Sequence, residues 1–322
     1  MKNIKNVIFG TGPLGWWIME SLLEKGEDEV SITMVNRSGK LPLNLPQTLP
    51  KRVDLRAGDA TDASFVAAIC KDADAVFHCA MPPYTRWPQL FPALTKGILE
   101  GVKTTKAKLI YCDNLYMYGD TQTRVLTEDL PNNPHGHKGK VRAEMAESLL
   151  SAHRAGEIKL VVGRGSDFYG PYVINSGLGE RFFKPGILGE TADLLGDLAL
   201  PHTYTYIKDF ARALVLLSEE DAAIGQIWHV PNAPTITTME MVSLVEQELG
   251  QSVKVRTAGP LMVNLLGLFI PMLKEMKEVM YQWNRPYVVD HSKFIGSFNL
   301  QTTDPKIAIK ETLGWYRQAF SK

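Results

Sequence analysis

Three glycines stand close together near the start of the chain, in the run Gly10-Thr11-Gly12-Pro13-Leu14-Gly15. An apolar run typical of a β-strand precedes them, and a segment with helical spacing follows. Gly10 permits a tight turn, Gly12 leaves no Cβ atom in the path of a pyrophosphate, and Gly15 lets a helix pack closely on a sheet. The N–H groups at the start of that helix attract phosphate. The sequence therefore predicts a dinucleotide-binding loop whose contacts are Gly10, Gly12, Pro13, Leu14 and Gly15.

The residues after the second apolar run indicate which dinucleotide this loop takes. A carboxylate about 20 positions past the loop holds the ribose 2′-hydroxyl of NAD, but here Val35 is followed by Asn36, Arg37 and Ser38. A guanidinium attracts a 2′-phosphate, whereas a carboxylate repels it. Asn36 and Arg37 are therefore predicted to bind NADP in preference to NAD. The alternative is that Arg37 is a solvated loop charge and Asn36 binds a plain ribose.

Small and polar residues follow the third and fourth apolar runs. Asp59, with Ala60 beside it, is placed to accept a hydrogen bond from an adenine amino group, or to cap the helix that begins near Asp62. His78 lies inside an apolar run and is expected to be a core histidine. The residues after it include small side chains that allow a cofactor to approach closely. The predicted contacts there are Cys79, Ala80 and Met81.

The elements that position these residues alternate between short apolar runs and segments of helical period. Consecutive apolar positions are typical of strands buried on both faces of a parallel sheet. Strand–helix alternation predicts an α/β fold with a Rossmann-type, doubly wound parallel sheet. The predicted strands are Asn6–Phe9, Val30–Val35, Val53–Ala57, Ala75–Cys79, Leu109–Cys112, Leu160–Gly163, Thr203–Ile207 and Gln226–Val230. The predicted helices are Leu14–Glu24, Ala63–Ile69, Gln89–Val102, Gly139–His153 and Asp209 to about Ser218.

The pattern loosens after about Gly165, which indicates a second region. We expect residues 1–165 plus about 200–232 to form the dinucleotide-binding Rossmann domain. Residues of about 166–199 plus 233–322 are expected to form a smaller, mostly helical substrate-binding region. The longest apolar run, Leu261–Leu273, is shorter than the stretch of about 20 residues that spans a bilayer. It is predicted to belong to a helix around Leu261–Tyr281 that covers the site or fills the core.

Composition excludes several classes of partner. The 322 residues carry 35 Lys and Arg against 35 Asp and Glu, so no broad basic field is available for nucleic acid. Cys70, Cys79 and Cys112 show no C-x-x-C spacing, and neither a metal site nor a disulfide framework is expected. The first residues lack the pattern of a signal peptide. A cytoplasmic protein that binds no membrane is predicted.

Motif order and spacing over nearly all of the chain resemble the extended short-chain dehydrogenase/reductases, the NAD-dependent epimerase/dehydratase group. The glycine loop and the segment Gly58–Asp62 carry the first part of this resemblance. The C-terminal Thr312–Trp315 also fits. The other matching motifs are Asn114–Gly119, Lys140–Glu144, Arg164–Pro171 and Tyr206–Asp209.

The resemblance implies a catalytic Ser after the fifth strand and a Tyr and a Lys spaced as Y-x-x-x-K. In this family the Tyr donates or accepts the proton, and the Lys lowers the pKa of the Tyr and holds the nicotinamide ribose. Lys140 falls on the Lys position. Gly136 stands at the Tyr position and Asn114 at the Ser position, so the chain is an atypical member with two substituted catalytic residues.

Other residues nearby are candidates for the missing chemistry. Hydride transfer to a carbonyl needs a proton donor near the new alkoxide. His135 and His137 stand just before the helix that carries Lys140, and an imidazolium can donate a proton near neutral pH. Asn114 is predicted to polarise the substrate oxygen, and Asp113 to orient a histidine. An equally weighted alternative is that the His/Lys segment is a polar loop that caps a helix.

The resemblance also places a substrate between the sheet and the C-terminal region. The candidate contacts are Tyr84, Tyr116, Phe168 and Tyr169, with Arg181 to hold an anion. Aromatic walls suit a fairly apolar ligand better than a nucleotide sugar, unless these aromatic residues are ordinary core. The helices Gln89–Val102 and Gly139–His153 correspond to the family's dimer helices, so a homodimer is expected.

Together these features predict an NADP-dependent oxidoreductase that acts on the carbonyl/alcohol pair of a small, fairly apolar metabolite. The first alternative is an epimerase or dehydratase that uses its cofactor transiently. The second is a catalytically silent NADP-binding sensor, which the missing Tyr and Ser would favour.

Overall fold

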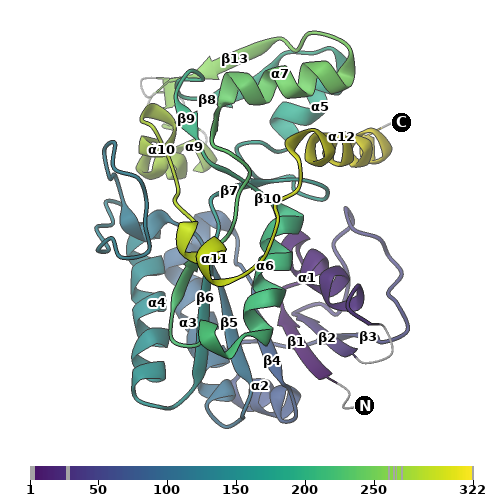
Figure 1. The fold of residues 1–322 in the computed structure, drawn as a ribbon, viewed down its shortest axis with the longest axis vertical. Helices are drawn as coiled ribbons and strands as arrows, with labels where there is room; N and C mark the ends of the chain where they lie inside the picture. Colours follow the sequence, from purple (N-terminus) through teal and green to yellow (C-terminus); the bar gives the residue numbers. More distant parts are fainter. Residues whose placement is uncertain are drawn as a thin grey trace. The chain divides into compact units, whose positions relative to one another are not determined.

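The computed structural model describes residues 4–26, 30–259, 262–263, 265, 267–269 and 271–320. The chain forms two compact units, each assembled from separate stretches of sequence (Figure 1). The first unit contains Met1–Asn114, Lys140–Arg164 and Phe210–Trp228. The second contains Leu115–Gly139, Gly165–Asp209 and His229–Lys322. No helix in the described residues is long and apolar enough to cross a membrane.

A seven-stranded sheet forms the centre of the first unit, in the order β3-β2-β1-β4-β5-β6-β11. Figure 1 labels the strands from β3 to β6 of this order. Neighbouring strands from β3 to β6 run parallel. The strand order reverses between β1 and β4, which is the Rossmann arrangement, so the predicted fold class is confirmed. The strands are β1 (Ile4–Phe9), β2 (Val30–Asn36), β3 (Val53–Ala57), β4 (Ala75–His78), β5 (Lys108–Asp113), β6 (Lys159–Arg164) and β11 (Ile227–His229).

Helices cover both faces of this sheet. Ile8 of β1 and Gly163 of β6 point to the same face by register, and they contact α1 and α6 respectively. His78 and Tyr111 point to the opposite face, where they contact α3 and α4. Every residue of β4 and β5 is buried as a result, which explains their unbroken apolar runs. The helices are α1 (Pro13–Leu23), α2 (Ala63–Cys70), α3 (Trp87–Val102), α4 (His137–Arg154) and α6 (Ile207–Glu219).

The second unit has short paired strands and helices around its own apolar core. β7 pairs with β10, and β8 with β13, in parallel, while β9 and β12 are antiparallel. Phe182, Phe183, Ile309 and Tyr316 are among the fully buried residues of its core. The strands are β7 (Asp167–Tyr169), β8 (Ala192–Leu195), β9 (Pro201–His202), β10 (Tyr204–Tyr206), β12 (Ile236–Thr237) and β13 (Val255–Ala258). The helices include α5 (Glu180–Leu188), α7 (Thr238–Leu249), α9 (Pro271–Met276), α10 (Tyr281–Asn284), α11 (Ser292–Ser297) and α12 (Pro305–Phe320).

The predicted elements of the first unit agree with the structure to within two residues at each end. The strands of the second unit were harder to predict, because two to four residues show too little of the alternating pattern. The helix predicted around Leu261–Tyr281 lies partly outside the described residues. Within them, α9 is followed by a 3-10 turn at Lys277–Val279 and then by α10.

Candidate functional site

The glycine loop joins β1 to α1, and its three glycines meet three different surroundings. Gly10 has a φ of +107°, and a Cβ atom there would lie 2.6 Å from the backbone N of Ala80 and from the carbonyl O of Cys79. A Cβ atom on Gly15 would lie 2.0 Å from the carbonyl O of Gly10. At Gly12 nothing lies within 4 Å of the corresponding position. Gly10 and Gly15 are therefore needed for packing, whereas Gly12 leaves open space at the start of α1.

The start of α1 is suited to bind an anion. Gly12 is the N-cap residue, it makes no side-chain capping hydrogen bond, and Pro13 begins the helix. An N-terminus without a capping side chain leaves backbone N–H groups and the positive end of the helix dipole for a phosphate. The residues present therefore fit a dinucleotide whose pyrophosphate approaches over Gly12.

Asn36 organises the turn that follows β2. Its side-chain Nδ2 donates to Thr11 Oγ1 at 2.7 Å and to the carbonyl of Lys40 at 2.8 Å. Its Oδ1 accepts from the backbone N–H groups of Ser38 at 3.0 Å and Gly39 at 2.7 Å. Asn36 thus connects this turn to the glycine loop. The turn presents three exposed side chains that can donate hydrogen bonds, namely Arg37, Ser38 and Lys40.

The sequence left two roles open for Asp59, hydrogen bonding to an adenine amino group and capping of α2. Asp62 is the N-cap of α2 and accepts from the backbone of Ser64 and Phe65, so the capping alternative for Asp59 is wrong. Asp59 is exposed and accepts two hydrogen bonds from Thr61, each 2.9 Å. These bonds, together with the charge of Arg37, lower the pKa of the Asp59 carboxyl. Asp59 is therefore an ionised acceptor on the same edge of the sheet as the turn that Asn36 organises.

The remaining predicted cofactor contacts differ in exposure. Cys79 is half-buried, with its thiol 3.6 Å from the carbonyl O of Gly10. Met81 is exposed, and Ala60 is buried. His78 is fully buried against Thr95, and burial followed by the charge of Arg142 lowers its pKa to about 3. His78 is a neutral core histidine, as predicted.

Asp113 belongs to a buried charge network. Its two oxygens form ion pairs with Arg142 and Arg164, each with an Nε–O distance of 3.1 Å. The guanidinium of Arg142 also lies over the rings of Trp87 and Phe91. Asp113 therefore engages two arginines rather than a histidine, and this corrects its predicted role. Asn114 follows directly and is half-buried at the end of β5.

Two lysines at the start of α4 have opposite surroundings. Lys140, the residue that falls on the catalytic Lys position, is exposed. Lys138 is fully buried, and its ammonium group forms ion pairs with Glu275 and, at 2.9 Å, with Glu278. A separation of two residues turns side chains to opposite sides of a helix. Sequence reasoning missed Lys138, because its two acidic partners come from a distant segment.

The two candidate histidines are both exposed. The Nδ1 atom of His135 accepts a hydrogen bond from the backbone N–H of Asp120 at 3.1 Å. Its ring lies 6.4 Å from the ring of Tyr281, measured between centroids. His137 is the first residue of α4. The backbone contact fixes one ring nitrogen of His135 as an acceptor, so its proton in the neutral form lies on Nε2.

The predicted substrate contacts are found in three kinds of environment. Tyr84 is half-buried and packs its ring 5.0 Å from that of Trp87. Tyr169 is buried in the core of the second unit beside Tyr206, which corrects its predicted place in an open binding surface. Arg181 lies on α5 and is exposed. Tyr116 and Phe168 are half-buried.

Sequence reasoning also missed a buried histidine in the second unit. His202 Nε2 lies 2.9 Å from Asp167 Oδ2, and its Nδ1 lies 3.2 Å from the carbonyl O of Gln282. The ring stacks on Trp283 with a centroid separation of 4.4 Å. Both ring nitrogens of His202 therefore face acceptor oxygens. No spacing in the sequence connects these residues.

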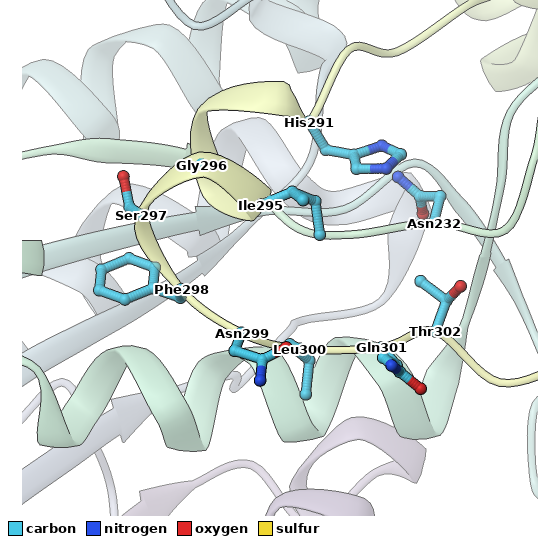
Figure 2. Close-up of a pocket in the computed structure, with 10 residues that line it drawn as sticks. All are labelled: Asn232, His291, Ile295, Gly296, Ser297, Phe298, Asn299, Leu300, Gln301 and Thr302. Carbon is cyan, nitrogen blue, oxygen red and sulfur yellow. The ribbon is translucent and has the colours of Figure 1, made fainter.

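A separate pocket of about 660 Å³ lies within the second unit (Figure 2). Figure 2 shows the ring of His291 and the amide of Asn232 close together at one side of it. The Asn232 amide accepts from Thr205 and donates to Val230. None of the predicted site residues is among the described residues that line it. No group of three His, Cys, Asp or Glu side chains in the described part of the chain could hold a metal ion.

The model of the NAD dependent epimerase/dehydratase family matches residues 7–230, which is more than half of the chain. This chain belongs to that family. A putative UDP-arabinose 4-epimerase of Arabidopsis thaliana is 28% identical over 157 residues. That match covers 44% of this chain and only 36% of the relative, so the chain spans about a third of the length of the curated relative it matches.

Solved structures of the family share the fold. The UDP-glucuronic acid 4-epimerase of Bacillus cereus, in complex with NAD, aligns with a TM-score of 0.79 and 19% identity over 99% of this chain and 98% of that one. The dTDP-glucose 4,6-dehydratase of Bacillus anthracis, also in complex with NAD, aligns with a TM-score of 0.80 and 16% identity over 99% and 98% of the two chains. Identities this low establish the fold alone.

Proposed function

We propose that this chain is an enzyme that binds a nicotinamide dinucleotide and moves a hydride between it and a carbon bearing a hydroxyl or carbonyl group of a small molecule. The observation that carries the proposal is the glycine loop, in which Gly12 is open while Gly10 and Gly15 are packed. Family membership favours transient use of the dinucleotide, as in an epimerase or a dehydratase. A net oxidoreductase acting on an apolar metabolite is the second candidate, because Tyr84 and Phe168 offer half-buried aromatic surface.

The bound dinucleotide would supply the hydride acceptor and donor, and the chain would position the reacting groups. Lys140 would hold the nicotinamide ribose, since its ammonium group is exposed at the start of α4. Asn114 would donate a hydrogen bond to the substrate oxygen as charge develops there. His135 and His137 remain the predicted proton donors.

NADP is the proposed form of the cofactor. Arg37, Ser38 and Lys40 expose two cations and a hydroxyl on the turn that Asn36 organises. A 2′-phosphate would accept charge-assisted hydrogen bonds from these donors. NAD, which is bound in the structures of the Bacillus relatives, is the alternative.

Two further features remain predictions, a homodimer and a cytoplasmic location. A groove of about 540 Å³ runs between α3 and α4, the helices predicted to form the dimer, and its lining includes Leu99, Lys103 and Met145. Sedimentation velocity of the purified chain would test the dimer. A single species at the monomer mass would contradict it.

A turnover screen tests the proposed function. The chain is incubated with NAD or NADP and with the nucleotide sugars of its relatives, and products are resolved by ion-exchange chromatography. Conversion without net dinucleotide reduction supports an epimerase or dehydratase. In a second assay, small alcohols replace the nucleotide sugars. A net rise in the near-ultraviolet absorbance of reduced nicotinamide there supports the oxidoreductase. Dinucleotide binding without any conversion would indicate a sensor and contradict the proposal.

A further inference from the structure

The space beside Gly136 is filled by a side chain from a distant part of the sequence. A Cβ atom on Gly136 would lie 2.0 Å from Oε2 of Glu278 and 2.6 Å from the Cδ of the same residue. Any side chain at position 136 would therefore collide with this carboxylate. Position 136 is also where the resemblance expects the proton-transferring tyrosine. The carboxylate of Glu278 therefore occupies the place where the Cβ atom of that tyrosine would lie.

Lys138 fixes the position of this carboxylate. Glu278 Oε1 accepts from the Lys138 ammonium group at 2.9 Å and from the Lys138 backbone N–H at 3.4 Å. Glu275 binds the same ammonium group. The positive end of α4 adds a favourable field, because its first turn begins at His137. Two carboxylates therefore share one buried cation, which holds Glu278 in place.

A neutral hydroxyl lies in the same neighbourhood. Tyr281 follows Glu278 by three residues, and burial is the main cause that raises the pKa of its phenol. The charges of Asp167, Asp120 and Glu278 act in the same direction. Tyr281 therefore stays protonated and able to donate a hydrogen bond. The carboxylate acceptor and this phenol donor belong to one short stretch of the chain.

We propose that Glu278, rather than His135 or His137, is the proton-transfer group of this chain, in place of the tyrosine that position 136 lacks. The proposal rests on the hydride-transfer function proposed above. In the oxidation direction the Glu278 carboxylate accepts the proton of a substrate hydroxyl, while the carbon that bears it gives a hydride to the oxidised nicotinamide dinucleotide. The products are a carbonyl, a protonated Glu278 and the reduced dinucleotide. In the reverse direction Glu278 returns the proton to the substrate oxygen as the hydride returns to carbon.

A stability cycle on the protein without added ligands tests the steric part. The melting temperature is compared for Gly136→Ala in the wild-type, Glu278→Gly and Glu275→Gly backgrounds. We expect Gly136→Ala to lower the melting temperature in the wild type and in Glu275→Gly, but not in Glu278→Gly, where the whole colliding side chain, including its Cβ atom at 2.6 Å, is absent. An equal fall in all three backgrounds would overturn the placement of Glu278.

Turnover tests the chemical part, with a substrate that the nucleotide-sugar screen identifies. Glu278→Gln keeps the size of the side chain and removes its ability to take a proton. General acid–base groups contribute about a hundredfold to ten-thousandfold, so we expect kcat to fall by that factor while KM and dinucleotide affinity hold. Glu275→Gln, which alters the other carboxylate on Lys138, is the matched control and keeps its kcat. Added formate should partly restore kcat in Glu278→Ala, where sodium chloride should not.

The outcomes separate the inference from the function on which it rests. A wild-type protein that turns over substrate, with Glu278→Gln equally active, overturns the inference alone. The inference is also overturned if Glu278→Gln keeps its kcat and the double variant His135→Asn/His137→Asn loses it. A wild-type protein that binds dinucleotide and converts nothing removes the proposed function, and the role of Glu278 falls with it.

Discussion

The loop at the start of α1 and the segment at the start of α4 were both expected to carry function, and they are built in opposite ways. The glycine loop is a backbone site, in which the positions of Gly10, Gly12 and Gly15 are set by one strand and the helix that follows it. The start of α4 is a side-chain site. Its buried Lys138 depends on Glu275 and Glu278, which lie more than 130 residues further along the chain.

This difference has a consequence for how each region tolerates change. A backbone site requires small residues at fixed spacing, so its chemistry can be recognised from a short motif. A side-chain site can exchange one functional group for another from elsewhere in the fold. The Rossmann half of this chain keeps its family pattern, whereas the resemblance puts Gly136 and Asn114 at the positions where it expects Tyr and Ser.

The sharpest test of this comparison is Lys138→Met beside Lys140→Met. Removing the Lys138 cation leaves the two carboxylates without the cation that pairs with both, and breaking a buried ion pair costs about 3–5 kcal/mol. Lys140 is exposed, so its replacement should change the free energy of unfolding by less than about 0.5 kcal/mol. Denaturant titration of both variants measures the difference. Equal losses of unfolding free energy in the two variants would show that Lys138 is not the buried partner of Glu275 and Glu278.

A second pair of variants tests the backbone site. Gly15→Ala places a Cβ atom 2.0 Å from the Gly10 carbonyl, and overpacking of this kind costs about 1–3 kcal/mol. Gly12→Ala meets nothing within 4 Å and keeps an extended φ of −75°. We therefore expect a lower melting temperature for Gly15→Ala and an unchanged one for Gly12→Ala. A loss of stability in Gly12→Ala would contradict the open space at that residue.

Arg37→Ala tests the cofactor form. A hydrogen bond to a charged group contributes about 1.5–3 kcal/mol, so affinity for NADPH should fall about tenfold to a hundredfold. Affinity for NADH should hold, because NADH has no 2′-phosphate. The control is Arg56→Ala, an exposed arginine of β3 that is paired with Asp54. Tighter binding of NADH than NADPH by the wild type would contradict the proposed preference.

An effect spread over several pH units concerns His78. Its pKa is lowered from 6.5 to about 3 in the folded state, so between these values the unfolded chain binds more protons than the folded one. Stability should therefore fall as pH drops through this window, by at most about 1.4 kcal/mol per pH unit from this residue. His78→Asn should flatten the slope. Denaturation midpoints recorded stepwise across the window check this, and an unchanged slope would contradict a neutral His78.

The sequence was sufficient for what local spacing determines. The alternation of apolar runs predicted the strands β1 to β6, and the turn chemistry predicted the glycine loop. It also identified His78 as a core residue. Each of these follows from neighbours along the chain, whose side-chain direction is set by the strand or helix itself.

Long-range pairing accounts for most of what sequence reasoning missed. Nothing in the spacing shows that Asp113 meets two arginines, that Tyr169 is core, or that Lys138 rather than Lys140 is buried. The sequence did show one sign of the second site. Gly136 stands where the resemblance expects a tyrosine, and in the structure the side chain of Glu278 occupies the space beside it.

The central claim is that a dinucleotide binds over Gly12, and a fluorescence titration tests it most directly. Trp16 and Trp17 lie on α1, directly after the glycine loop, and report on this region. We expect NADPH or NADH to quench the wild-type protein saturably, and Gly12→Ala to lose this response while its melting temperature is unchanged. Equal binding by the wild type and Gly12→Ala, or no binding by the wild type, would contradict the account.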